Sequence, residues 1–372
     1  MKTNKILVAA LMTVATMGAS AEEKSTPWFT NVKLSGYGIV EYQYSGQKGN
    51  KSNTFDLRLG RLALDGKLKG DFYWKVQMQV NGNTSTKGTS PRLVDLFAEW
   101  QKYDFARVKV GQFKLPFTFE NPMHPIDQGF MSYAQNVSYL SGFSDRSGAQ
   151  SSNGRDIGVQ LQGDLLKDNT GRHLLHYQVG VFNGQGINTK DVDQRKTVAG
   201  GVWLMPVEGV RIGVFGLEGS YARKYTYTNE YGGKYTETLS LPQHRYAVSA
   251  EYAPKTDWTF RTEYIHGTGY GFKTSDNEKN ADLKLNGYGN KADGLYALVI
   301  APVVKNKMHV KARYNMYRRD AEWTSAKTMY EIGADYKFTK NVGVSAEYVF
   351  VNDRTLSDPN YSMADVQMYF RF

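Results

Sequence analysis

The final residues of the chain, DVQMYFRF at 365–372, alternate between two series of side chains. The even-numbered residues from Val366 to Phe372 are apolar, and the odd-numbered ones from Asp365 to Arg371 carry polar groups. A period of two is the side-chain period of a β-strand. Similar stretches recur from residue 32 onward, with turn residues between them. A strand with one apolar and one polar face is the unit of a transmembrane β-barrel. The sequence therefore predicts an all-β fold, an antiparallel transmembrane β-barrel.

The number of alternating stretches is about sixteen, an even number as expected of bacterial barrels. The expected strands lie near 32–44, 54–66, 70–81, 91–102, 105–113, 154–165, 172–182, 196–205, 209–222, 243–253, 257–267, 291–302, 307–318, 326–338, 341–351 and 361–372. Short connections alternate with long ones, and the long ones lie at 45–53, 82–90, 114–153, 183–195, 223–242, 268–290 and 351–360. A membrane barrel has short periplasmic turns and long outer loops, whereas a soluble β-sandwich has no reason to alternate them.

Three of the expected strands show clear faces. Even-numbered residues are predicted to face outward at 72–80, 308–316 and 342–350, with odd-numbered polar residues facing inward. Two strands lose this phase, near Leu59–Leu62 and near Val214–Phe215, which suggests β-bulges. The stretch LYALVIA at 295–301 is apolar on both faces, so the pattern does not orient it.

The N-terminus has the features of a secretory signal peptide. Lys2 and Lys5 precede an apolar stretch at 6–17, and Ala19-Ser20-Ala21 matches an A-x-A cleavage site. The apolar stretch is too short to span about 30 Å of hydrocarbon. We expect residues 1–21 to be the signal peptide and residues 22–372 to form a single outer-membrane barrel. The expected location is the bacterial outer membrane, in contact with its lipid.

Composition restricts the possible partners. A mean hydropathy of −0.52 fits a barrel whose polar inner residues offset its lipid-facing ones. The absence of cysteine excludes disulfides and thiol chemistry. The formal net charge of +10 is compatible with nucleic acid, an acidic surface or an anionic solute. Because export argues against nucleic acid, anionic lipid and small anionic or neutral hydrophilic solutes remain as partners.

The longest connection, 114–153, is rich in proline and aromatic residues, more than a fully solvated loop needs. These residues are Pro116, Phe117, Phe119, Pro122, Pro125, Phe130, Tyr133, Tyr139 and Phe143. We expect this third loop to fold into the lumen and narrow it, since a barrel of about sixteen strands is otherwise a wide aqueous channel. The alternative is a cap outside the barrel that packs on itself.

Charges around the narrow part of a pore set its selectivity. The predicted anion-binding residues of the pore are Arg58, Arg61, Lys75, Arg107, Lys109 and Arg155. The first five lie on strands that precede the third loop in sequence, and Arg155 lies just after it. Inward acidic residues are about as numerous around the whole wall, and they include Asp56, Asp95, Glu99, Asp156, Glu251, Glu263, Glu331, Asp335 and Glu347. Anion preference would therefore depend on the local cluster rather than on net charge.

Several of these segments resemble the phosphate-selective porin O and P family. They are FDLRLGRLALDGKLKGDFYWKVQ (55–77), VDLFAEW (94–100), VKVGQFKLPFTFEN (108–121) and GRDIGVQLQGDL (154–165). The resemblance implies a sixteen-stranded outer-membrane porin, usually trimeric, with the third loop in the lumen and an arginine-lined anion path. Two positions depart from the family. Leu59 stands where the family often has a second adjacent arginine, and Gln112 stands where some members have arginine.

Enzymatic function is not expected. His173 and His176 lie three residues apart on one strand and so on opposite faces, which is poor geometry for one metal ion. No catalytic, metal or cofactor residues are predicted. We expect a porin for passive diffusion of small hydrophilic solutes, with anions such as phosphate or polyphosphate favoured, assembled as a homotrimer. A non-selective porin and an adhesion barrel acting through its Tyr- and Gly-rich loops are the alternatives.

Overall fold

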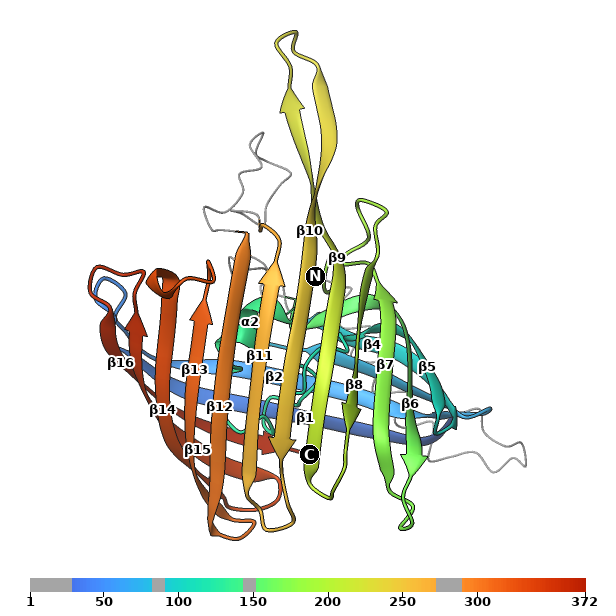
Figure 1. The fold of residues 1–372 in the computed structure, drawn as a ribbon, viewed down its shortest axis with the longest axis vertical. Helices are drawn as coiled ribbons and strands as arrows, with labels where there is room; N and C mark the ends of the chain where they lie inside the picture. The colour runs from blue at the N-terminus through green and yellow to red at the C-terminus, as the bar shows by residue number, and fades with distance from the viewer. Residues whose placement is uncertain (1–28, 82–90, 143–151, 272–289) are drawn as a thin grey trace, which may run out of the picture.

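The computed structural model describes residues 29–81, 91–142, 152–271 and 290–372. These residues form sixteen strands in one closed antiparallel barrel, in which each strand pairs with its neighbours in sequence and β1 closes on β16 (Figure 1). The predicted signal peptide lies outside the described residues. The strands are β1 (Phe29–Ser45), β2 (Ser52–Leu68), β3 (Phe72–Gln79), β4 (Arg92–Tyr103), β5 (Ala106–Lys114), β6 (Arg155–Lys167), β7 (His173–Phe182), β8 (Thr197–Leu204), β9 (Val210–Thr228), β10 (Lys234–Tyr252), β11 (Thr259–Thr268), β12 (Lys291–Val304), β13 (Met308–Arg318), β14 (Ala326–Lys337), β15 (Val342–Asp353) and β16 (Asn360–Arg371).

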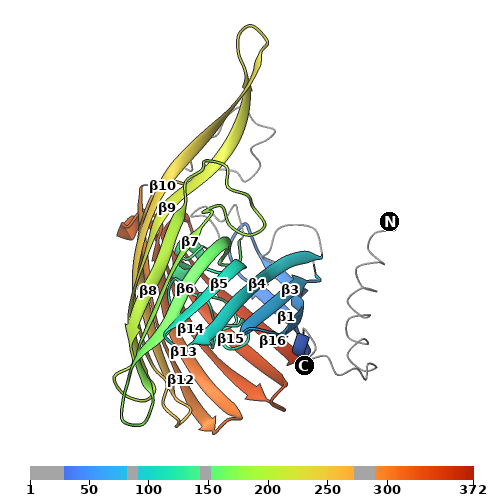
Figure 2. The same cartoon turned by 90° about the vertical axis from the view of Figure 1, so that its right-hand side faces the viewer.

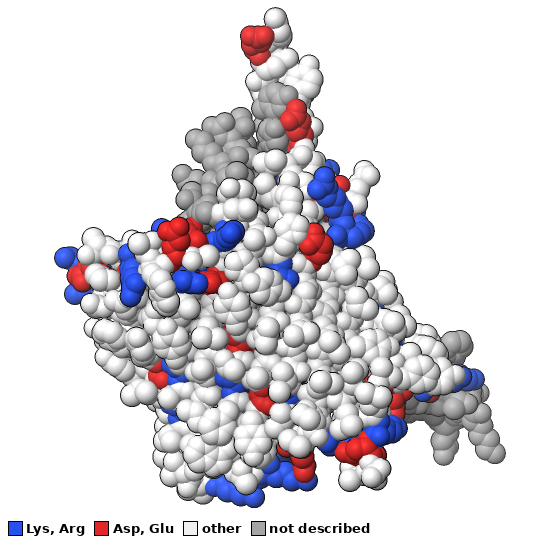
Figure 3. Space-filling view, in the orientation of Figure 1, with Lys and Arg blue, Asp and Glu red and all other residues white. Residues whose placement is uncertain are grey.

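The outer wall of the barrel is apolar. Large side chains on successive strands are exposed there, among them Val159, Ile332 and Phe370. Charged side chains gather toward the two ends of the barrel and leave most of the wall between them uncharged (Figure 3). A soluble monomer rarely exposes an apolar surface larger than a few hundred Å². Such a wall, on a barrel whose closure pairs the backbone groups of every strand, is typical of a barrel that spans a membrane.

The predicted strand faces are confirmed. In β13, Lys311, Arg313 and Asn315 are buried inside the barrel while Val310 is exposed on the outer wall. The alternation of β15 is equally regular, with Glu347 buried and Tyr348 exposed. Among the described residues no helix has the length and apolar character needed to cross a membrane.

The predicted bulge in β2 is confirmed and lies slightly earlier than expected. Between the pairs Ile39–Leu59 and Glu41–Asp56, β2 advances three residues while β1 advances two. This extra residue changes the phase of the strand. As a result, Arg58 and Arg61 both reach the interior, although a regular strand would place them on opposite faces.

The predicted bulge in β9 is wrong. Its pairing with β8 and β10 runs without a register shift, and Phe215 faces inward between the outward residues Val214 and Gly216. The structure also orients β12, whose sequence is apolar on both faces: Tyr296 and Leu298 face inward. Both strands look irregular in sequence because their inner faces pack against an apolar loop rather than against water.

The predicted outer loop at 223–242 is mostly strand. β9 and β10 remain paired from Val210–Tyr252 to Thr228–Lys234, and they rise as a two-stranded ribbon well above the barrel rim (Figures 1 and 2). The sequence of the ribbon is rich in Tyr and Thr, which favour strands, but it has no apolar face. Hydrophobic alternation indicates strands that have one face toward lipid. It therefore does not predict a ribbon that stands in water.

Candidate solute pathway

The third loop supplies the main apolar core of the molecule. Its residues from Leu115 to Leu140 pack against the inner faces of β7–β13, in a cluster of buried residues: Phe113, Leu115, Phe117, Phe119, Phe130, Ala134, Val137, Leu140, Phe182, Ala199, Phe215, Leu217, Ala247, Ile265, Ala292, Tyr296, Leu298 and Tyr317. The short helix α2 (Gln135–Leu140) contacts β11, β12 and β13 (Figure 1). The described part of the loop therefore lies against one side of the inner wall.

Carboxylates of the inner wall accept hydrogen bonds from the backbone of this loop. Glu263 of β11 accepts from the N–H groups of Phe119 and Glu120 at 2.7 and 2.8 Å. Glu347 of β15 accepts from the N–H of Met131 at 2.9 Å. Hydrogen bonds to charged groups are stronger than neutral ones. Each carboxylate therefore fixes one position of the loop.

Cations of the same wall bind carbonyl oxygens of the loop. Lys311 donates to Gly129 O at 2.9 Å, and Arg313 donates to Ser132 O at 2.9 Å. Lys311 is also ion-paired with Glu347, and Arg313 with Glu331. The sequence suggested that Glu263, Glu331 and Glu347 were charges of the pore wall. In the structure, Glu263 and Glu347 accept hydrogen bonds from the loop backbone. Glu331 and Glu347 neutralise the cations that bind the loop carbonyls.

The opposite side of the loop borders a cavity of about 320 Å³ inside the barrel. Four of the predicted site residues, Arg61, Lys75, Lys109 and Arg155, line it. The loop closes the other side with Pro116, Pro122, Met123, His124 and Pro125, which carry no formal charge when the imidazole is neutral. Burial lowers the pKa of His124 to about 4, so this ring is uncharged at neutral pH. The charge of the cavity at pH 7 therefore comes from its arginine, lysine and aspartate side chains.

Two of the cavity cations are paired with carboxylates. Arg155 forms a two-pronged contact with Asp95, with Nε–Oδ1 and Nη2–Oδ2 distances of 2.6 and 3.2 Å. Lys109 Nζ lies 3.7 Å from Glu99. These pairs fix the positions of the cations and cancel much of their charge.

Two other cavity cations are not neutralised in this way. Arg61 is buried and donates to the neutral side-chain oxygen of Gln79 at 3.3 and 3.4 Å. Within the described part of the chain, neither Arg61 nor Lys75 has a carboxylate within 4.0 Å. An uncompensated positive charge in a confined aqueous space attracts anions and repels cations.

The remaining predicted site residues lie away from this cavity. Arg58 is ion-paired with Glu41 at 3.0 Å, and Arg107 with Asp164 at 2.6 Å. Asp164 also contacts His176 at 2.6 Å. Both arginines face the lumen, but each is held beside a carboxylate. The structure thus brings four of the six predicted residues together and places these two elsewhere.

Sequence reasoning missed Lys114 as a cavity residue. Its ammonium group donates to Asn121 O at 2.6 Å, Met123 O at 2.9 Å and Tyr133 Oη at 2.8 Å. It therefore holds the start of the loop in shape as well as lining the cavity. The available signal was its place in GQFKLPF, where it is the last residue before the proline-containing loop.

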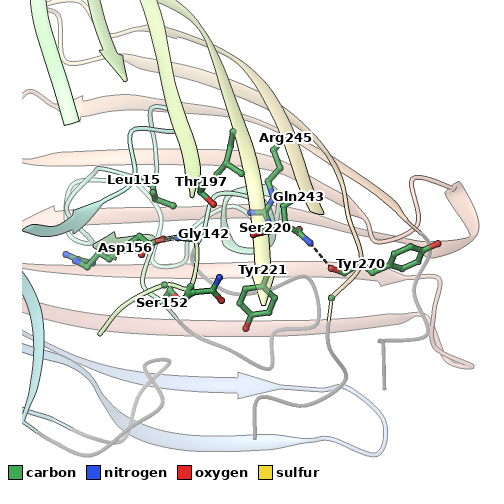
Figure 4. Close-up of a pocket in the computed structure, with 16 residues that line it drawn as sticks. Leu115, Gly142, Ser152, Asp156, Thr197, Ser220, Tyr221, Gln243, Arg245 and Tyr270 are labelled. Atoms are coloured by element: carbon green, nitrogen blue, oxygen red, sulfur yellow. Dashed lines mark hydrogen bonds between the residues drawn. The ribbon is translucent and has the colours of Figure 1, made fainter. Parts of the chain in front are cut away.

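A second, smaller cavity of about 70 Å³ lies beside the two ends of the loop, between Leu115 and Gly142 on one side and Ser220 and Gln243 of the wall on the other (Figure 4). Gln243 donates to Tyr270 O at 2.7 Å at its edge (Figure 4). Leu115 and Arg155 line both cavities. The two spaces are therefore neighbours along the same inner wall.

A closed barrel with an apolar outer wall and a polar, partly filled interior defines a porin of the bacterial outer membrane. This class of protein provides a channel rather than a site of chemical conversion. The family model described as phosphate-selective porin O and P matches residues 34–199, which confirms the resemblance seen in the sequence. A search of curated protein sequences finds no match.

Solved porin structures share the fold at low sequence identity. The anion-selective porin from Comamonas acidovorans aligns with a TM-score of 0.63 and 13% identity, covering 92% of this chain and 99% of that one. A loop-deletion mutant of OmpT of Vibrio cholerae gives 0.61 and 14%, covering 93% and 100%. Salmonella typhi OmpF in complex with daunomycin gives 0.61 and 14%, covering 92% and 97%. At these identities the similarity establishes the fold alone.

Proposed function

We propose that this porin passes small hydrophilic solutes by diffusion and prefers anions. The observation that carries this proposal is the charge of the larger cavity. Among the described residues that line it, Arg61, Lys75, Lys109 and Arg155 are cationic and Asp95 is acidic. The loop side of the cavity supplies no carboxylate to balance them.

The electrostatic energy of this excess positive charge in the cavity is sufficient to affect permeation. Two opposite unit charges 4 Å apart attract by about 4 kcal/mol at an effective dielectric constant of about 20. A tenfold preference needs about 1.4 kcal/mol. Part of the attraction is spent in removing water from the anion, and flexible ammonium and guanidinium groups replace some of that hydration. An anion preference requires only a fraction of the available energy.

We also propose that the third loop sets the size limit of the path. It packs against the inner wall along β7–β13, is bonded to β15, and borders the cavity on the basic side next to β2–β6. A wide barrel without such an obstruction would discriminate weakly, because ions far from the wall are screened over about 8 Å at physiological salt. Narrowing brings every passing ion within reach of Arg61 and Lys75.

The remaining organisation is proposed from related proteins. OmpT of Vibrio cholerae, which has a similar fold at 13% identity, is described in a trimer form. We propose a homotrimer for this chain too, exported by a signal peptide at 1–21 and inserted as a barrel built from 22–372. Phosphate is the solute that the family description suggests.

The combined substitution of Arg61→Gln and Lys75→Gln tests the charge proposal. We expect the chloride-to-potassium permeability ratio to fall by a factor of about three or more, because the two unneutralised cations of the cavity are removed. The measurement is the reversal potential in a planar bilayer under a KCl gradient.

Arg58→Gln with Arg107→Gln is the matched control. It removes the same formal charge from the same lumen, but from two carboxylate pairs outside the cavity. A smaller change of the permeability ratio in the control supports the proposal that the cations of the cavity set the anion preference. An equal change in both variants, or no change in the first, contradicts it.

A further inference from the structure

The larger cavity is lined by apolar groups as well as cations. Tyr37, Phe97 and Phe113 line its wall side, and Pro122 and Pro125 line its loop side. A small inorganic anion gains nothing from such surface, and losing water against it costs energy. A solute that has an apolar face gains about 25 cal/mol for each Å² that it buries there.

The aromatic rings form a row across neighbouring strands. Ring centroids are 6.0 Å apart for Tyr73 and Phe97, 5.9 Å for Phe97 and Phe113, and 5.6 Å for Phe113 and Phe182. Such spacings are typical of interacting aromatic pairs. Phe97 is partly exposed within this row. Phe97 and Phe113 line the cavity, and Phe182 is buried behind them, so an aromatic or sugar ring in the cavity would meet two adjacent rings rather than an isolated side chain.

A cation lies beside this surface. Lys109 Nζ is 5.1 Å from the ring centroid of Phe97 and 5.3 Å from that of Phe113. Lys109 shares its charge with Glu99, 3.7 Å away, but its ammonium group still has hydrogens to donate to a second carboxylate or phosphate. Such a group bound at Lys109 would place the rest of an organic solute against these rings. The arrangement matches a molecule whose anionic group is attached directly to a ring.

The same cavity holds neutral amides at Gln77, Gln160, Gln162 and Gln178. Gln160 is buried, and its Nε2 donates to Gln162 Oε1 at 2.6 Å. Its own oxygen, Gln160 Oε1, accepts no hydrogen bond within the described part of the chain. A buried acceptor without a partner is less stable than one that accepts a hydrogen bond. A solute hydroxyl in the cavity could donate to it.

We propose that the cavity prefers hydroxylated organic anions, in which a carboxylate or phosphate is attached to a ring, over inorganic phosphate and chloride. This inference rests on the proposed function and specifies its solute class. The cations bind the anionic group, Phe97 and Phe113 contact the body of the solute, and Gln160 accepts from its hydroxyl. Phosphorylated sugars and hydroxylated aromatic acids share this chemistry.

The test is the block of chloride current through the full protein in a planar bilayer. The probes are 4-hydroxybenzoate, glucose 1-phosphate and inorganic phosphate, added separately at pH 7. We expect the organic probes to halve the chloride current at concentrations about tenfold lower than inorganic phosphate. The two organic probes then show whether an aromatic acid or a sugar phosphate fits better.

Phe97→Ala should raise the half-blocking concentration of the organic probes about tenfold, and that of inorganic phosphate by a smaller factor. Phe97→Leu keeps an apolar side chain for packing and should give an intermediate effect. Phe350→Ala, on the outer side of β15, is the control. It should leave the half-blocking concentrations of the organic probes and of inorganic phosphate unchanged.

Equal block by organic and inorganic probes, or an unchanged response in Phe97→Ala, would overturn this inference. The chloride-to-potassium permeability ratio of the same channels reports on the proposed function separately. A channel that prefers chloride but does not distinguish the probes contradicts the inference alone. A channel without anion preference contradicts the proposed function.

Discussion

Replacing residues 118–150 with a short glycine–serine linker is expected to raise single-channel conductance several-fold. The loop occupies the lumen along β7–β13 and is bonded to β15, and without it the barrel would be a wide aqueous channel. The replacement is geometrically simple. Leu115 N donates to Gly154 O at 2.8 Å, so the two ends of the loop already lie side by side. β5 and β6 stay paired up to Lys114 and Arg155.

The β9–β10 ribbon offers a matched deletion. Lys224 and Thr238 are directly paired, so a two-residue turn can join them and remove the tip of the ribbon. The ribbon stands above the barrel (Figure 2), and its loss should leave conductance unchanged. Unchanged conductance after removal of the loop would refute the constriction. A ribbon deletion that closes the channel would show that the outer ribbon, rather than the loop, controls permeation.

Glu263→Gln is expected to release the loop locally. Glu263 accepts from two loop N–H groups and from Tyr296 Oη at 2.7 Å, and it is fully buried. A glutamine has a single acceptor oxygen and would turn its amide N–H₂ toward one of the loop donors. Each hydrogen bond to a charged group is worth about 1.5–3 kcal/mol. Open-channel current noise should therefore increase.

A thiol provides a direct measurement of loop release. The chain has no cysteine, so Ala134→Cys, at a fully buried loop position, gives a single reporter. Combined with Glu263→Gln, it should react with a soluble maleimide at least about tenfold faster than alone, since tenfold corresponds to about 1.4 kcal/mol. Glu41→Gln is the control, because Glu41 is also buried but pairs with Arg58 of the wall. Equal rates in all three proteins would mean that Glu263 does not anchor the loop.

Much of the fold could be predicted from hydrophobic alternation, because a strand between lipid and water carries apolar residues on one face and polar residues on the other. The rule fails where a strand faces something other than lipid outside and water inside. Phe215 and Tyr296 face the loop, so β9 and β12 appear out of phase or unreadable in the sequence. The ribbon beyond the pair Lys224–Thr238 rises above the barrel rim, so its pattern resembles that of a loop.

The candidate site was predictable in part for a similar reason. Alternation placed Arg61, Lys75 and Lys109 inside the barrel, but it does not report which inward charges have partners. Whether a cation is free or neutralised depends on contacts between distant strands, such as Arg107 with Asp164. The roles of Glu263 and Glu347 depend on the path of the loop, which has no periodic pattern to read.

The reversal potential of the unmodified protein in a KCl gradient tests the central claim most directly. The uncompensated charges of Arg61 and Lys75 beside the loop predict a potential displaced toward the chloride equilibrium potential, and a smaller displacement as salt screens these charges. A potential displaced toward the potassium equilibrium value would contradict an anion pathway along the basic side of the lumen.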